Sequence, residues 1–81
     1  MAEVKLEVDK TLYIRMEDGT AGVLSEGTEA YLCFGGRWSH VTVVELRLKS
    51  MLLRSEDGVE FVKLYSKLED VSDKKPIGVN L

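Results

Sequence analysis

The stretch EAYLCFGGRWSH, residues 29–40, decides the fold. Two strand-like runs flank Gly35-Gly36, and glycine accepts the positive φ angles that a tight hairpin turn requires. Because side chains alternate between the two faces of a strand, we expect Phe34 to point inward, on the same face as Leu32. The stretch therefore predicts an antiparallel hairpin in an all-β protein.

The same stretch contains the chain's one cysteine, one tryptophan and one histidine, at Cys33, Trp38 and His40. A thiol beside an imidazole is the pair that activates a cysteine nucleophile. No nearby residue is placed to orient the imidazole or to stabilise an oxyanion, so we predict no catalytic residue and no enzymatic activity. Arg37-Trp38 is typical of a contact point, because Trp and Arg are enriched at interface hot spots. A single Trp in a small domain can equally form a lid on the core.

Before this hairpin, residues 4–16 alternate between apolar and polar side chains, which is typical of strands with one buried face. The alternation is interrupted at Asp9-Lys10, where we expect a bend or a bulge. Glu17-Asp18-Gly19 then predicts a turn, and residues 21–24 a short returning strand. Residues 1–26 are therefore expected to form an N-terminal β-hairpin that packs on the rest of the domain.

After the hairpin, residues 38–54 are rich in Val and Leu and predict one long strand. The apolar positions change parity between Val43 and Val44, which indicates a bulge or a sharp bend. We expect a second bend at Ser50. Strands bent in this way are how small barrels turn a corner.

The C-terminal third begins with a hairpin turn at Glu56-Asp57-Gly58, which is followed by a returning strand over residues 59–64. Residues 65–70 are expected to form a single helical or 3₁₀ turn, because short pieces of this kind often connect strands. Residues 72–81 are polar, contain Pro76 and predict a tail or a last edge strand.

Length, charge and cysteine content restrict the class of protein. A chain of 81 residues predicts one domain, residues 1–81, with a thin margin of stability. One cysteine excludes an internal disulfide, and with one histidine it completes a zinc site only if carboxylates join it, so we predict no metal and no cofactor. The alternating N-terminus predicts no signal peptide and no membrane segment, and the free thiol fits the cytoplasm. The net charge of −3 argues against strong generic binding to nucleic acid.

From Gly27 to Val71 the order of features resembles a Tudor-type or SH3-like small barrel. A glycine precedes a strand, a short turn, the aromatic Trp38, a long bent strand, an acidic-glycine hairpin and the closing segment LYSKLEDV, residues 64–71. The resemblance implies a five-stranded barrel over residues 27–71. It also implies recognition of methylated lysine or arginine by an aromatic cage. Phe34 and Trp38 match the first two cage positions, but the hairpin where further aromatics are expected has none.

The predicted function is a non-catalytic protein-interaction or assembly module. We expect it to bind a protein partner through the aromatic hairpin and a groove of the barrel, as a bacterial or phage accessory protein would. The predicted contact residues are Phe34, Arg37, Trp38 and Tyr65. Homo-oligomers are a further expectation, because Val79 and Leu81 in the tail can pair with the edge of a neighbouring copy.

The alternative is a small barrel that binds single-stranded RNA or DNA. Small barrels do so with a positively charged groove and aromatic stacking platforms. The residues predicted for this role are Arg47, Lys49, Lys63 and Lys67 for charge and Tyr31 for stacking. Glu45 and Glu60 on the same strands favour an ordinary mixed surface instead. Methyl-peptide reading is a lesser alternative.

Overall fold

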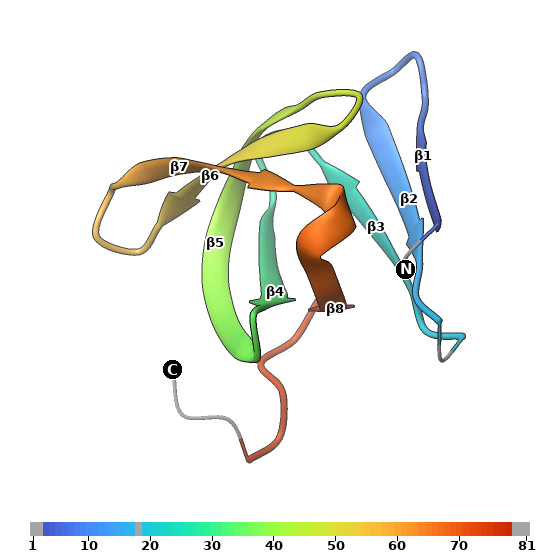
Figure 1. The fold of residues 1–81 in the computed structure, drawn as a ribbon. Helices are drawn as coiled ribbons and strands as arrows, with labels where there is room; N and C mark the ends of the chain where they lie inside the picture. The colour runs from blue at the N-terminus through green and yellow to red at the C-terminus, as the bar shows by residue number, and fades with distance from the viewer. Residues whose placement is uncertain (1–2, 18, 79–81) are drawn as a thin grey trace.

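The computed structural model describes residues 3–17 and 19–78, which form two antiparallel β-sheets (Figure 1). The described part of the chain contains no α-helix, so the all-β prediction is confirmed. Closure into a barrel is not seen among the described strands. The smaller sheet has the order β1-β2-β3, from β1 (Glu3–Leu6), β2 (Thr11–Arg15) and β3 (Ala21–Ser25). The larger sheet has the order β7-β6-β5-β4-β8. Its strands are β4 (Glu29–Phe34), β5 (Arg37–Leu46), β6 (Ser50–Ser55), β7 (Glu60–Leu64) and β8 (Leu68–Ser72). The 3₁₀ turn η1 (Tyr65–Lys67) connects β7 to β8.

The predicted central hairpin is confirmed as β4 and β5. Gly35 and Gly36 have φ angles of 58° and 76°, the two consecutive positive values that a two-residue hairpin turn requires. The turn fixes the register, in which Phe34 lies opposite Arg37 and Cys33 opposite Trp38. Opposite residues point to the same face of a sheet, so Phe34 and Trp38 point to different faces.

The expected N-terminal hairpin is wrong in one respect, because the segment forms a three-stranded sheet. The chain reverses fully at Asp9-Lys10, where only a bend was expected. Lys10 has a φ of 67°, and Asp9 Oδ1 accepts a hydrogen bond from the N–H of Thr11 at 3.1 Å. Leu6 then faces Leu12 across the turn, so the row of apolar side chains continues through the reversal. The interruption at Asp9-Lys10 marks the position of this turn, but without a glycine it indicated a bend and not a full reversal.

The single long strand expected over residues 38–54 is also wrong, because β5 and β6 are antiparallel partners joined by a turn at residues 47–49. The predicted bulge is confirmed, since the register shifts between Val43 and Glu45. The turn itself has no glycine, proline, asparagine or aspartate. One local hydrogen bond closes it, from the N–H of Arg47 to the carbonyl of Ser50 at 2.9 Å. Distant residues add to this, and Glu26 accepts a hydrogen bond from the N–H of Leu46 at 2.9 Å.

Tyr65 is the second distant support of this turn. Its hydroxyl donates to the carbonyl of Arg47 at 2.6 Å, and its backbone N–H donates to the carbonyl of Lys49 at 3.1 Å. Burial raises the pKa of Tyr65 above its ordinary value of 10.0, which keeps the hydroxyl protonated as a donor. The expected 3₁₀ turn is confirmed over Tyr65–Lys67 as η1, which carries Tyr65, but residues 68–70, expected in the same turn, belong to the strand β8.

Both sheets contribute to one hydrophobic core. Gly22 of β3 lies directly against Val71 of β8, and a Cβ added there would come within 2.8 Å of Val71 Cγ1. The smaller sheet therefore packs on the larger one at a position that only glycine fits. The buried cluster consists of Leu12, Ile14, Met16, Leu24, Ala30, Leu32, Val41, Val43, Leu46, Met51, Leu53, Tyr65, Leu68 and Val71.

After β8, residues 73–78 form no strand, and Ile77 is fully exposed. Val79 and Leu81, the tail residues expected to pair with another copy, lie outside the described residues. Within residues 3–17 and 19–78 no helix is long and apolar enough to cross a membrane.

Candidate functional site

Three aromatic side chains share the outer face of the β4–β5 hairpin, and we call them the outer aromatic strip: Tyr31, Trp38 and His40. Tyr31 lies opposite His40 in the hairpin register, and their rings stack with centroids 4.5 Å apart and an interplanar angle of 11°. Trp38 precedes His40 by two residues on β5, which places it on the same face. All three residues are half-buried, so the strip is accessible and is not part of the core cluster.

Two glutamates flank His40, one at each ring nitrogen. Nδ1 lies 2.6 Å from Glu56 Oε1 and Nε2 lies 3.1 Å from Glu29 Oε1. A neutral imidazole carries one N–H, so only the doubly protonated ring donates to both carboxylates. The two carboxylates sit on opposite sides of the ring and do not converge on a common point. Accordingly, the described residues include no group of three His, Cys, Asp or Glu that could hold a metal ion.

At the other end of the strip, Glu69 of β8 reaches the buried thiol of Cys33 and the tip of the hairpin. Cys33 Sγ lies 3.7 Å from Glu69 Oε2, and the N–H of Gly36 donates to both carboxylate oxygens at 3.0 and 3.1 Å. Desolvation, followed by the negative charge of Glu69, raises the pKa of Cys33 above its ordinary value of 9.0. The thiol is thus held in its protonated, weakly nucleophilic form. Both ring nitrogens of His40 face glutamates. The absence of catalytic function stays a prediction.

Alkylation of Cys33 tests this electrostatic description. Iodoacetamide reacts with the thiolate, so we expect the reaction of the folded protein to reach half its maximal rate at a pH above 9.0. Glu69→Gln removes the negative charge and should lower that pH. The pKa of the Cys33 thiol is higher in the folded state than in the unfolded state. The protein should therefore also lose stability as the pH rises through the folded-state pKa.

The urea-unfolded protein is the control for this experiment, since its thiol is solvated and distant from Glu69. If the folded and unfolded proteins have the same alkylation profile, the proposed effect of burial and of Glu69 is wrong.

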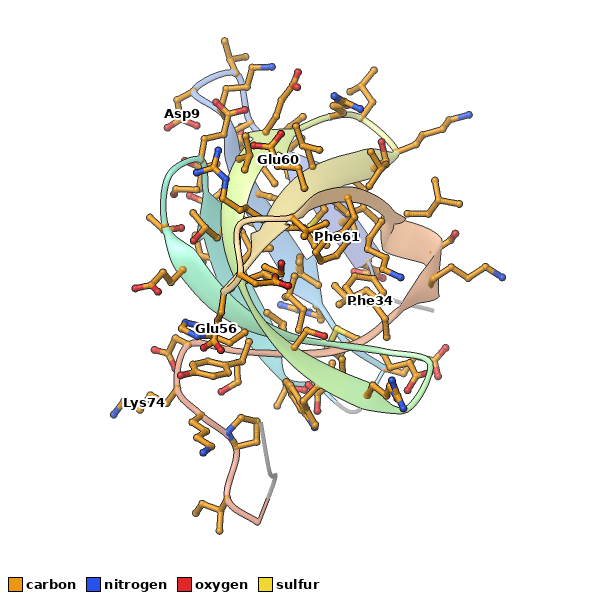
Figure 2. All side chains as sticks on the ribbon, turned by 90° about the vertical axis from the view of Figure 1, so that its left-hand side faces the viewer. Asp9, Phe34, Glu56, Glu60, Phe61 and Lys74 are labelled. Carbon is orange, nitrogen blue, oxygen red and sulfur yellow. The ribbon has the colours of Figure 1, made fainter. Side chains whose placement is uncertain are left out.

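Two predicted contact residues lie away from the strip. Phe34 points to the inner face and packs partly buried against the core, where Lys63 Nζ lies 5.6 Å from its ring centroid and 5.8 Å from that of Phe61. Figure 2 shows Phe34 and Phe61 close together on one side of the molecule. Tyr65 is 5% exposed and bonded to the β5–β6 turn. The structure therefore separates Phe34 and Tyr65 from Trp38, whereas Arg37 is exposed beside it.

The four basic residues predicted to bind nucleic acid lie on segments that meet around Tyr65. Arg47 and Lys49 are in the β5–β6 turn, Lys63 is on β7 and Lys67 is in η1. Arg47 pairs with Glu45 at 3.0 Å, and Lys63 covers two phenylalanine rings. Tyr31, the predicted stacking residue, stacks on His40 in the outer aromatic strip instead. The rings beside the basic residues are those of Phe34 and Phe61, which are half-buried under Lys63, and that of Tyr65, which is buried.

The sequence prediction missed the acidic residues around the strip. The pairing of Tyr31 with His40 can be counted outward from the two-residue turn, and Glu29 lies two positions before Tyr31 on the same face. Glu56 and Glu69 gave no such signal, because they are 16 and 33 residues from the groups that they contact.

No protein-family model matches this chain, and no curated protein or solved structure shows significant similarity to it.

Proposed function

We propose that the protein is a non-catalytic interaction module that binds a positively charged segment of a partner protein on the outer aromatic strip. The observation that carries this proposal is the combination of rings and carboxylates on one face. Aromatic faces attract lysine and arginine side chains through cation–π contacts, and neighbouring carboxylates add to that attraction. The carboxylates beside the strip belong to Glu29, Glu56, Glu69 and Asp70.

Each of these carboxylates is tied to the strip by a contact or by the sheet register. Glu29 and Glu56 face His40, and their side chains are 70% and 71% exposed. Glu69 contacts Cys33, and Asp70 lies opposite Cys33 on β8. Arg37 at the hairpin tip is an exposed cation next to the strip, and with Trp38 it supplies the residue types enriched at hot spots. A basic peptide that crosses the strip would therefore meet both rings and acidic groups.

We further infer that the larger sheet curls into an SH3-like, Tudor-like barrel, as the resemblance implies. Its last strand, β8, pairs with its first strand, β4, which is the strand order that a curled five-stranded sheet needs. The 3₁₀ turn η1 joins the two edge strands, β7 and β8. On this proposal the outer aromatic strip lies on the barrel wall, and the module works as a cytoplasmic accessory protein.

The nucleic-acid alternative has weaker support. Carboxylates beside the outer aromatic strip repel phosphates, and Lys63 covers the Phe34 and Phe61 rings, the half-buried rings that lie beside the basic residues. Methyl-peptide reading by a cage of Phe34 and Trp38 is also disfavoured, because these two rings point to opposite faces of the hairpin.

The proposal is tested by binding of a fluorescein-labelled, lysine- and arginine-rich peptide measured by anisotropy. We expect the wild type to bind it more tightly than a matched acidic peptide. Trp38→Ala should weaken binding about 30-fold, the effect of losing a typical hot-spot residue. Tyr13→Ala is the matched control, because Tyr13 is a 47% exposed aromatic residue on the smaller sheet. It should leave the affinity unchanged.

Undiminished binding by Trp38→Ala would exclude the strip as the contact surface. Equal binding of the acidic peptide would refute the role of charge. A labelled single-stranded RNA or DNA run in parallel at two salt concentrations tests the alternative. If its affinity exceeds that of the peptide, falls with salt and is lost in Arg47→Ala/Lys49→Ala, the nucleic-acid function replaces the proposed one.

A further inference from the structure

The edge strand β7 exposes apolar side chains. Val62 is 51% exposed and Leu64 is 48% exposed, and both lie on the outer face. Of the four edge strands in the described part of the chain, β7 is the one with two exposed large apolar residues, since β3 has Val23 and β1 and β8 have none. An edge strand with unpaired backbone groups and exposed apolar side chains is a template for pairing with another strand.

The sequence of β7, EFVKL, is complementary to itself when two copies run antiparallel about Val62. In that register Val62 lies beside Val62 of the second copy, and Phe61 lies beside Lys63 of the second copy. The first pair extends an apolar row, because Val62 already faces Leu52 of β6. The second pair repeats a contact that exists within one copy, where the Lys63 ammonium lies over the Phe61 ring. No like charges are opposed within this five-residue register.

Charges at the two ends of β7 favour the same orientation. The turn before the strand carries the exposed acidic residues Glu56 and Asp57. The η1 turn that follows the strand carries Lys67, next to the turn with Arg47 and Lys49. An antiparallel pair places the acidic end of one copy beside the basic end of the other, whereas a parallel pair opposes like charges.

We propose that the protein forms a two-fold symmetric dimer in which the β7 strands of two copies pair antiparallel and join the larger sheets into one. A two-fold interface uses the same patch on both copies, which the self-complementary register of β7 supplies. The rings of the outer aromatic strip lie on β4 and β5, two strands away from this edge. The dimer thus presents two copies of the strip, but its existence does not depend on what the strip binds.

The other edge of the larger sheet does not offer an equivalent match. A two-fold pairing of β8, LEDVS, about its central residue places Asp70 directly beside Asp70 of the second copy. Directly opposed like charges destabilise a strand pair. Pairing of β7 with β8 of another copy is a head-to-tail contact, which builds a ring or a filament instead of a dimer.

Sedimentation equilibrium over a wide range of concentrations tests the proposal. We expect a monomer–dimer equilibrium for the wild type. Val62→Lys and Val62→Glu each oppose like charges across the two-fold axis, so each should weaken dimerisation about tenfold or more. An equimolar mixture of the two variants should restore the dimer, because residue 62 then meets an opposite charge. Val23→Lys, a 59% exposed valine on the edge strand β3, is the matched control and should dimerise as the wild type does.

A monomeric wild type at the highest concentration would overturn the proposal, and so would undiminished dimerisation of both Val62 variants with circular dichroism that shows native folding. Species larger than a dimer would establish the head-to-tail contact instead. If the Val62 mixture fails to dimerise while the wild type does, the pairing register about residue 62 is wrong.

Discussion

Leu12→Ala is expected to lower the free energy of unfolding by about 3 kcal/mol, because it removes a fully buried side chain and leaves a cavity. Leu12 is 0% exposed and belongs to β2 of the smaller sheet, yet it packs in the same buried cluster as residues of the larger sheet. For a chain of 81 residues a loss of this size is a large part of the total stability. The variant should therefore be partly unfolded under mild denaturing conditions.

Trp38 makes this experiment informative about cooperativity, because the one tryptophan lies on the larger sheet. Urea unfolding of Leu12→Ala followed by Trp38 fluorescence and by far-ultraviolet circular dichroism should give coincident curves, both shifted to lower urea. Leu48→Ala is the control, since Leu48 is 85% exposed and its removal should change stability little. A fluorescence transition that keeps its wild-type midpoint would mean that the two sheets unfold independently.

Gly22→Ala is expected to destabilise the protein by about 2 kcal/mol through overpacking. The added Cβ would lie 2.8 and 3.1 Å from the two γ-carbons of Val71, so the contact between β3 and β8 must widen. The double variant Gly22→Ala/Val71→Ala should lose less stability than the sum of the two single variants, because the new methyl group occupies space that Val71 gives up. Chemical denaturation of the four proteins measures this coupling.

Gly58→Ala separates steric overlap from backbone strain in this series. Gly58 has a φ of 88° and open space where a Cβ would be placed, so its substitution strains the backbone without a clash. Val71→Ala should not reduce the effect of Gly58→Ala. If it rescues both glycine variants equally, or if Gly22→Ala and Val71→Ala are simply additive, the close approach of β3 to β8 does not limit stability.

The sequence was sufficient for the parts of the fold that nearby residues determine. Gly35-Gly36 predicts its hairpin because two positive φ angles in succession favour glycine strongly. The change of parity after Val43 predicts the bulge, since a strand that keeps burying apolar side chains must gain a residue there. Both signals lie within a few residues of the feature that they predict.

The two reversals that the sequence analysis does not predict both lack a glycine. Lys10 adopts a positive φ without being glycine, and its turn preserves the apolar alternation on both sides. The reversal at residues 47–49 depends on Tyr65 and Glu26, each of which is about 20 residues away. Local turn signals therefore predict one long strand, whereas the structure has two strands joined by a turn that distant residues support.

The candidate site likewise has a part that nearby residues predict and a part that they do not. The sequence predicts Trp38 as a contact residue. Its neighbours on the outer aromatic strip follow from the hairpin register. The same register places Phe34 on the opposite face, which separates two residues that the prediction combined. Glu69 and Glu56 come from segments that only the folded sheet brings to the strip, so their carboxylates were not predictable from residues 29–40.

The support that Tyr65 gives to the β5–β6 turn also orders the steps of folding. The β4–β5 hairpin carries its own glycine turn and can close early, in the microsecond range typical of isolated hairpins. The reversal at residues 47–49 has one local hydrogen bond, from the N–H of Arg47 to the carbonyl of Ser50, and it gains the two hydrogen bonds of Tyr65 only when η1 arrives, after β6 and β7 have been brought into place. We therefore expect the β4–β5 hairpin to form early and the contacts of Tyr65 with the β5–β6 turn to form late.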